Sequence, residues 1–444
     1  MTTLKCPDTP TAQGAVNICN QLHEAGFEAV LAGGCVRDIL LGRVPKDYDI
    51  ATSAVPKEVQ RVFPDSEAIG AAFGVILVKI PQGAYEIATF RKDGDYMDGR
   101  HPETVTFTSI EEDAHRRDFT VNALFFDPKT NDVIDYVGGL KDLDLRILRC
   151  VGNPDERFRE DYLRLLRAIR FSSQLDFKVA KETMDSICLN GNLIAKVSPE
   201  RIRTEMERLL CNDRRETGLS LLHTSGLLAE IFPELSAMVG CEQPPEFHPE
   251  GDVWVHTLLV MKQLESPSFP LAMGTLLHDV GKPPTQTFED RIRFNQHEKV
   301  GAEIANAICR RLRCSNEDTE HITWLVNQHM RVAHIPEMRD SKRKRLVREE
   351  GFSDLMELFR ADCLGSIGTL TNYDWIMDYK ESIPEEVIRP PALVTGNHLI
   401  EMGYKPGPLF KEILTAIEDA QLENEIHTYD EAVTWLQSRW PNPV

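Results

Sequence analysis

Residues 31–38 read Leu31-Ala32-Gly33-Gly34-Cys35-Val36-Arg37-Asp38. Residues 28–32, apolar after Glu28, predict a strand that ends at this segment, and the residues up to Leu41 predict a helix that begins in it. Two glycines at such a junction let backbone N–H groups approach a phosphate at the helix N-terminus. Arg37 adds a planar pair of donors for the same group. A Gly-Gly turn alone is common, so a phosphate-binding role needs support from neighbouring motifs.

A pair of aspartates lies further along the chain, in the run Lys46-Asp47-Tyr48-Asp49-Ile50. Side chains at positions i and i+2 of a strand project on the same side, so Asp47 and Asp49 should repel each other. Mg²⁺ prefers one or two carboxylates together with substrate phosphates, and two such ions can activate a hydroxyl and stabilise a leaving pyrophosphate. Asp47 and Asp49 are therefore the candidate catalytic residues and Mg²⁺ ligands. The alternative is a solvated edge strand.

The two segments together resemble the signature of the polymerase-β-like nucleotidyltransferases, in the family of class II tRNA nucleotidyltransferases and poly(A) polymerases. The match extends to the run Arg116-Arg117-Asp118-Phe119-Thr120-Val121-Asn122-Ala123. The resemblance implies that Gly34 and Arg37 bind nucleotide phosphates and that Arg117 contacts a phosphate or the ribose. Glu86 is either a third catalytic carboxylate or a buried residue paired with Arg91.

The next informative run is Glu160-Asp161-Tyr162-Leu163-Arg164-Leu165-Leu166-Arg167-Ala168-Ile169-Arg170-Phe171. Apolar residues at helical spacing predict a helix over residues 160–173, which would make Asp161 and Arg164 neighbours at i and i+3. Cytosine and adenine both present an amine beside an acceptor nitrogen, whereas uracil and guanine reverse that order. An Asp–Arg pair could therefore select C and A without a nucleic-acid template. The alternative is an ordinary surface ion pair.

The same run matches the family element EDxLRxLRAxRF at every fixed position. The resemblance implies that Asp161 and Arg164 recognise the base and that Arg167 and Arg170 contact the triphosphate. It implies a template-independent enzyme that adds C, C and A to the 3′ end of tRNA from CTP and ATP. The rivals in the same reaction class are an A-adding enzyme and a poly(A) polymerase.

Two segments favour CCA addition over these rivals. The polar, glycine-containing residues 91–102 predict a mobile loop, and in the family such a loop accompanies the change from C to A addition. Poly(A) polymerases of the family usually carry a Gly-Arg-Arg-Phe-like run before the third head strand. This chain instead has Gly70-Ala71-Ala72-Phe73-Gly74-Val75, which resembles the CCA type.

A second set of residues bears metal-binding side chains. His256, the run Leu276-Leu277-His278-Asp279-Val280-Gly281-Lys282 and the later Asp362 follow the order of the HD metal-dependent phosphohydrolases, which they resemble. Imidazole and carboxylate ligands suit a divalent transition metal as well as Mg²⁺. His297 and His329 could hold a second ion, and His248 is a weaker candidate in a linker. The resemblance implies either hydrolysis of phosphate esters in RNA ends or nucleotides, or a helical scaffold that retains a metal site.

The predicted fold class is α+β: a polymerase-β-like nucleotidyltransferase head with a small mixed sheet, then an all-helical neck, HD body and tail. A chain of 444 residues is too long for one core. We expect the head at residues 20–150, the neck at 151–240, the HD body at 245–380 and a small tRNA-binding tail at 385–444. Residues 241–251 and 382–391, rich in Pro and Glu, predict linkers.

Composition limits the cellular setting. The first residues lack the basic and apolar regions of a signal peptide, no apolar run is long enough to span a membrane, and the ten cysteines are scattered like reduced thiols. We therefore expect a cytoplasmic enzyme. The formal net charge of −20 is unusual for a protein that binds RNA, so cationic contacts must be local. The basic run at residues 342–345 predicts a solvated helix face, with RNA contact as the alternative.

Overall fold

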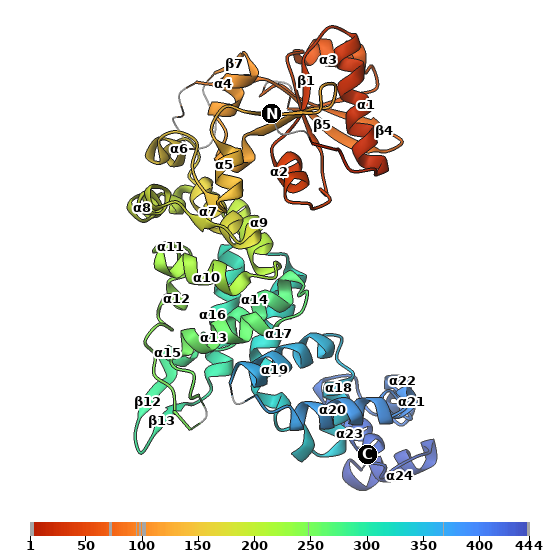
Figure 1. Cartoon of the computed structure of the whole chain (residues 1–444). Helices are drawn as coiled ribbons and strands as arrows, with labels where there is room; N and C mark the ends of the chain where they lie inside the picture. Colours follow the sequence, from red (N-terminus) through yellow and green to blue (C-terminus); the bar gives the residue numbers. More distant parts are fainter. Residues whose placement is uncertain are drawn as a thin grey trace. The chain divides into compact units, whose positions relative to one another are not determined.

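The computed structural model describes residues 4–70, 73–94, 96, 99, 104–246, 248–366 and 368–441 (Figure 1). The chain forms two compact units, one ending at Pro233 and the other beginning at Glu234. The predicted head and residues 151–233 of the predicted neck lie in the first unit, whereas residues 234–240 of that neck, the predicted HD body and the tail lie in the second. The division into four domains stays a prediction.

The head is built on a seven-stranded mixed sheet with the strand order β3-β4-β5-β2-β1-β8-β9. Only β2 and β5 pair in parallel within it; the other neighbours are antiparallel. The strands of the head, including the separate pair β6–β7, are β1 (Ala29–Ala32), β2 (Asp49–Thr52), β3 (Glu67–Gly70), β4 (Val75–Ile80), β5 (Gly83–Thr89), β6 (Arg91–Asp93), β7 (Val105–Phe107), β8 (Leu124–Asp127) and β9 (Asp132–Asp135). The head helices are α1 (Pro10–Glu24), α2 (Gly34–Leu40), α3 (Pro56–Val62), α4 (Ile110–His115) and α5 (Gly139–Asp144).

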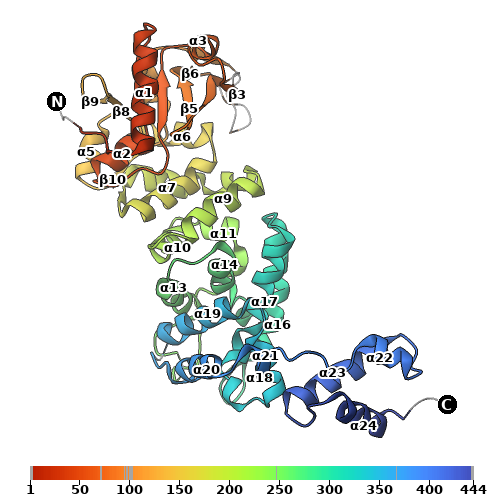
Figure 2. The same cartoon turned by 90° about the vertical axis from the view of Figure 1, so that its right-hand side faces the viewer.

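Both faces of this sheet are buried. Successive residues of a strand point to opposite faces, and so Leu31 joins one core cluster while Val30 joins the other. The first cluster includes buried residues of α1, which lies along the sheet in both views (Figures 1 and 2). Thr9 caps α1 by accepting a hydrogen bond from the Ala12 N–H at 3.2 Å. Polar side chains are exposed where this cover ends, as at Glu86 in β5.

The run quoted at residues 116–123 lies directly before a strand. That strand, β8, begins only at Leu124, because Thr120–Asn122 forms a 3₁₀ turn. The Asp118 carboxylate accepts hydrogen bonds from the Phe119 N–H and the Asn122 amide, and this local bonding competes with the sheet ladder. In the segment predicted as a mobile loop, residues 91–93 form β6, which pairs with β7. Residues 95, 97, 98 and 100–102 of that segment, and residues 71 and 72 of the run compared with poly(A) polymerases, lie outside the described residues.

The neck is helical apart from a short parallel pair formed by β10 (Ile147–Leu148) and β11 (Lys178–Val179). Its helices are α6 (Pro154–Glu160), α7 (Leu163–Leu175), α8 (Lys181–Asn190), the 3₁₀ segment Gly191–Lys196, α9 (Pro199–Leu210), α10 (Arg215–Thr224) and α11 (Leu227–Ile231). The short helix α12 (Pro233–Ser236) follows. The described residues contain no helix that is both long and apolar enough to cross a membrane.

The second unit begins with a helical body in which α13 packs on α19, and α17 packs on α14 and α16 (Figure 2). A hairpin of β12 (Gln286–Phe288) and β13 (Ile292–Phe294) interrupts it. The body helices are α13 (Val253–Gln263), α14 (Phe269–Leu277), α15 (Lys282–Thr285), α16 (His297–Arg311), α17 (Asn316–Val332), the 3₁₀ turn Ile335–Glu337, α18 (Asp340–Val347), α19 (Phe352–Gly365) and α20 (Thr371–Ser382). Further along the chain are α21 (Glu385–Ile388), α22 (Gly396–Glu401), α23 (Pro408–Leu422) and α24 (Tyr429–Arg439).

The basic run at residues 342–345 connects the body to the tail. Lys344 is buried and its Nζ donates to the Leu422 carbonyl at 2.6 Å, while Arg345 pairs with Glu418 at 2.6 Å. Arg343 lies over the ring of Trp375. For these three residues the prediction of a solvated helix face is wrong, because their cationic groups bind acceptors and an aromatic ring within the unit.

Replacing Lys344 tests this connection. Lys344→Met should lower the free energy of unfolding by about 1–3 kcal/mol, because it leaves the Leu422 carbonyl without its donor. Lys342 is exposed, so Lys342→Met is the matched control and should change stability by less than about 0.5 kcal/mol. Calorimetry of the full chain would measure both, and equal effects of the two substitutions would contradict the role assigned to Lys344.

Candidate functional site

Three carboxylates gather at one end of the head sheet. Asp49 is the first residue of β2, and Asp47 precedes it by two positions with the buried Tyr48 between them. In the parallel register, Ile50 lies opposite Ile87, so Asp49 and Glu86, one residue earlier on each strand, are neighbours. All three acidic residues are exposed. We call Asp47, Asp49 and Glu86 the head carboxylates.

The charges of the head carboxylates act on one another. The pKa of Asp49 is raised, first by partial desolvation and then by the charges of Glu86 and Asp47, whereas Arg117 opposes the shift. Arg91 pairs with Asp93 at 3.0 Å and donates to the Phe73 carbonyl, so the alternative of a buried Glu86 paired with Arg91 is wrong. Mutually repelling oxygen ligands of this kind fit a hard divalent cation.

The glycine turn lies beside an arginine. Gly33 has a φ of 73°, and a Cβ at this position would lie 2.9 Å from Nη1 of Arg117, so a larger residue would displace that side chain. Helix α2 begins at Gly34. Arg37 is buried, donates from Nη1 to the Asn122 side chain and pairs with Asp38 at 2.8 Å.

Asp113 belongs to the site although the sequence did not lead us to predict it. Its buried carboxylate accepts from Nε and Nη2 of Arg117 at 3.2 and 3.0 Å, and it also pairs with Arg116 at 2.7 Å. The signal was available, because Asp113 lies three and four residues before the two arginines at the end of α4. Asp113 therefore orients Arg117 toward the glycine turn.

Three of the predicted nucleotide-binding arginines surround one aromatic ring. The guanidinium carbons of Arg170, Arg167 and Arg37 lie 3.9, 5.1 and 5.4 Å from the centre of the Phe171 ring. Glu205 of α9 binds Nε of Arg170 and lies 3.8 Å from Arg167. Neither Glu205 nor Phe171 was predicted for this role from the sequence.

Asp118 connects the head to this arginine cluster. Its Oδ2 accepts from Nε of Arg167 at 3.0 Å, and its Oδ1 accepts from the amide of Asn122, which in turn binds Arg37. Burial alone would raise the pKa of Asp118, but the charge of Arg167 outweighs it and holds the pKa at about 2. Asp118 is therefore ionised at neutral pH. It positions Arg167 of the neck directly and Arg37 of the head through Asn122.

Asp161 and Arg164 do not share one helix. Helix α6 ends at Glu160, the backbone at Asp161 is extended, and the Asp161 carboxylate accepts from the N–H of Leu163 at the start of α7. The predicted i, i+3 helical geometry is thus wrong, because Asp161 binds local backbone instead of continuing the helix. Asp161 pairs with Arg201 at 2.8 Å, and Arg164 pairs with Glu160 at 2.6 Å.

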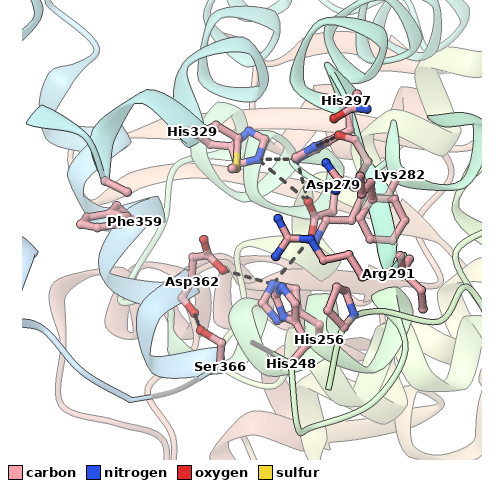
Figure 3. A pocket seen from close by; sticks show the side chains of 17 residues that line it. His248, His256, Asp279, Lys282, Arg291, His297, His329, Phe359, Asp362 and Ser366 are labelled. Carbon is pink, nitrogen blue, oxygen red and sulfur yellow. Dashed lines mark hydrogen bonds and ion pairs between the residues drawn. The ribbon is translucent and has the colours of Figure 1, made fainter. Parts of the chain in front are cut away.

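The second unit brings together the four residues of the predicted HD set. His256 comes from α13, His278 and Asp279 follow the end of α14, and Asp362 comes from α19. Nε2 of His256 lies 3.1 Å from Asp362 and 3.7 Å from Asp279 (Figure 3). Nε2 of His278 lies 3.2 Å from Asp279. Facing nitrogen and oxygen atoms of this kind could hold a metal ion.

A second group adjoins the first through Asp279. Its Oδ1 lies 3.4 Å from Nε2 of His297, and the Nε2 atoms of His297 and His329 are 3.3 Å apart. These two histidines, predicted as possible ligands of a second ion, lie on α16 and α17. The six residues of both groups, called the HD cluster below, are His256, His278, Asp279, His297, His329 and Asp362.

Backbone carbonyls orient three histidines of the HD cluster. Nδ1 of His278, His297 and His329 lies 2.7, 2.9 and 2.7 Å from the carbonyl oxygens of Thr275, Phe294 and Val326. A proton on Nδ1 makes these bonds and leaves the Nε2 lone pair facing the cluster. Nε2 of His278 is buried and has no hydrogen-bond partner among the described residues, which is the arrangement expected of a metal ligand.

Glu250 orients the fourth histidine, from a segment that the sequence predicted only as a linker. Its Oε1 contacts Nδ1 of His256 at 2.7 Å and Nδ1 of His248 at 2.9 Å. Burial would lower the pKa of His256, but Asp362 and Glu250 outweigh it and raise the pKa to about 9. Burial and the nearby His278 lower the pKa of His329 to about 3. The carboxylates thus favour positive charge at His256, where a metal ion would have to displace a proton, and His329 is neutral, the form that can bind a metal ion.

Three family models match the chain. The first, described as "Poly A polymerase head domain", matches residues 29–149. The second, "Probable RNA and SrmB- binding site of polymerase A", matches residues 176–238, and the third, "HD domain", matches residues 253–362.

Curated relatives and a solved structure extend the comparison. The chain is 47% identical to the CCA-adding enzyme of Geobacillus kaustophilus over 231 residues, a match that spans 52% of this chain and only 57% of that protein. It is 30% identical to the CCA-adding enzyme of Lactiplantibacillus plantarum over 95% of this chain and 94% of that one. The crystal structure of Bacillus stearothermophilus CCA-adding enzyme in complex with CTP superposes with a TM-score of 0.75, at 30% identity over 97% of this chain and 98% of that one. The chain therefore belongs to the CCA-adding enzyme family.

Proposed function

We propose that this protein adds C, C and A to the 3′ end of tRNA, using CTP and ATP in a metal-dependent reaction without a nucleic-acid template. The observation that carries the proposal is the juxtaposition, within one compact unit, of the head carboxylates with Arg117 of the RRDFTxNA run. We expect the reaction to take place in the cytoplasm.

Mg²⁺ is the proposed ion at the head, held by Asp47 and Asp49 with Glu86 as a third carboxylate. When bound, it would neutralise phosphate charge and lower the pKa of the attacking hydroxyl. The carboxylates would hold the ion beside the incoming triphosphate. An exposed carboxylate of this group can also accept the proton that the hydroxyl releases and pass it to water.

The proposed reaction is a nucleotidyl transfer. The 3′-hydroxyl oxygen of the RNA forms a bond to the α-phosphorus of the triphosphate, the bond from that phosphorus to the next bridging oxygen breaks, and pyrophosphate leaves. Gly34, Arg37, Arg117, Arg167 and Arg170 are the proposed contacts to the phosphates and sugar. The side chains of Arg167 and Arg117 are 29% and 19% exposed, against 9% for Arg37 and 5% for Arg170. We therefore expect Arg167 and Arg117 to make most of the direct contacts to the nucleotide. The buried Arg37 and Arg170 would contribute positive charge from behind them.

Removing one head carboxylate tests the polymerising site. Asp49→Ala should lower the rate of nucleotide addition by about a thousandfold or more, because charge stabilisation by metal ions is worth several kcal/mol. Asp144→Ala, an exposed aspartate at the end of α5, is the matched control. The assay is extension of 3′-trimmed tRNA with each triphosphate supplied separately, with products resolved by length.

The same assay decides between CCA addition and its rivals. Products of C, CC and CCA length on successively trimmed tRNA support the proposal. Addition of A alone indicates an A-adding enzyme, and long A tracts on an unrelated RNA indicate a poly(A) polymerase. Normal extension by Asp49→Ala protein would refute the role of the head carboxylates.

Base selection is assigned to Asp161 and Arg164, a carboxylate and a guanidinium on the two sides of the break between α6 and α7. Each already has a protein partner, Arg201 for Asp161 and Glu160 for Arg164. Binding of a base would exchange these ion pairs for hydrogen bonds to its amine and its ring nitrogen. A base with the opposite donor order would leave both groups unsatisfied.

Asp161→Ala should therefore reduce discrimination against UTP and GTP by about ten- to a hundredfold, the equivalent of one unsatisfied polar group. Binding of Mg²⁺ to the head should change little, because Asp161 is not one of the head carboxylates. Single-nucleotide addition rates with all four triphosphates measure the effect. Undiminished rejection of UTP and GTP by the variant would disprove base recognition by Asp161.

A second activity is proposed for the HD cluster, hydrolysis of a phosphate ester. The grouping of the buried Nε2 atoms of His256 and His278 with the carboxylates of Asp279 and Asp362 favours it over a scaffold without a metal site. His256, His278, Asp279 and Asp362 would hold one divalent ion, either a transition metal or Mg²⁺, and Asp279, His297 and His329 a second. Bound metal would lower the pKa of a water molecule for attack on phosphorus.

His278→Ala should lower both the bound-metal content and phosphate-ester hydrolysis, the latter by about a hundredfold or more. His321→Ala is the matched control, because His321 lies in the same body but pairs with Asp354 outside the cluster. Metal analysis and a phosphatase assay measure the two effects. Hydrolysis that persists unchanged in His278→Ala protein would show that the activity does not come from the HD cluster.

A further inference from the structure

Most of the HD cluster lines a cavity of about 500 Å³, whose wall includes β13 and the turn before it (Figure 3). Ile292, Phe294, Met330 and Phe359 contribute apolar surface to the lining of this cavity. Ligand sites for small molecules have volumes of about 300–1,000 Å³ and combine apolar walls with a few polar groups. The cavity therefore has the size and lining of a small-molecule site.

Three cationic side chains line this cavity, and two of them are engaged. Nζ of Lys282 lies 2.7 Å from Asp279 and donates to the Gln243 side chain at 2.6 Å. Arg293 binds both carboxylate oxygens of Asp290, at 2.8 and 3.0 Å from Nη2. Both cations therefore already have an acidic partner that offsets their charge.

The third cation, Arg291, differs from these two. It is exposed, and among the described residues its guanidinium has no hydrogen bond and no ion pair. It belongs to the turn between β12 and β13, and Figure 3 shows its side chain reaching into the pocket. The hairpin thus presents an unpaired guanidinium to a cavity whose opposite groups are metal-binding carboxylates and imidazoles.

We propose that Arg291 binds the phosphate group of a phosphate ester in this cavity, with the organic part of the ester against Phe294 and Phe359. A carboxylate cluster alone repels an anion, and a guanidinium on the facing wall offsets that repulsion. The planar fork of arginine matches two phosphate oxygens, which suits it to orient the ester over the HD cluster. This assignment rests on the proposed hydrolase function.

The test compares Arg291→Gln with Arg293→Gln, a matched control on the same hairpin whose guanidinium is already held by Asp290. The probe is inorganic phosphate, titrated calorimetrically into the full-length protein loaded with Mn²⁺. Arg291→Gln should weaken phosphate binding by about tenfold or more, the effect of losing a charge-assisted hydrogen-bond pair, and Arg293→Gln by less than about twofold. Bound Mn²⁺ and the rate of CCA addition should be unchanged in both variants.

The outcomes separate this assignment from the hydrolase proposal. Wild-type protein that binds phosphate through Arg291 but hydrolyses no phosphate ester would support the assignment and refute the hydrolase. Equal phosphate affinity of wild-type and Arg291→Gln protein would overturn the assignment, and so would a wild-type protein that binds no phosphate at millimolar concentration. A larger loss in Arg293→Gln than in Arg291→Gln would also overturn it.

Discussion

The ion pair between Asp118 and Arg167 is the interaction on which the first unit depends. A buried carboxylate without a counter-charge would cost several kcal/mol, so its guanidinium partner cannot be exchanged freely. The same carboxylate reaches Arg37 through the side chain of Asn122, and Arg167 shares Phe171 with Arg37 and Arg170. One buried negative charge thereby holds the head and neck arginines in a fixed arrangement.

The side chains of the HD cluster are also held in place by neighbouring polar groups. Its histidines are oriented by groups outside the cluster, three by backbone carbonyls and one by Glu250. A carbonyl that accepts the proton on Nδ1 determines which nitrogen faces the cluster, so the site is prepared for a cation before one binds. Both sites therefore owe their geometry to neighbouring groups that would not touch a ligand.

The distribution of charge reconciles an acidic chain with a function in RNA processing. The formal net charge is −20, yet many of the cations singled out from the sequence are engaged with acidic side chains or carbonyls. In the head and neck, such partners hold arginines near the carboxylates of β2 and β5. In the second unit, the basic run of α18 binds α23 instead of facing solvent. The role of each cationic side chain therefore depends on the groups that it contacts and not on the net charge of the chain.

Local sequence predicted the strand-turn-helix at Gly33–Gly34 and the acidic pair at Asp47 and Asp49, and the resemblance to known families predicted the fold of the head and the grouping of His256, His278, Asp279 and Asp362. These features rest on local periodicity and on motifs whose chemistry is carried by residue type. Other features emerged only from the folded chain: the helix break at Asp161, the roles of Glu205 and Glu250 as partners of arginine and histidine side chains, and the unpaired state of Arg291. They could not be predicted, because a polar side chain has several possible hydrogen-bond partners nearby in the sequence and others on distant segments. Only the packing of the folded chain decides which of these partners it contacts.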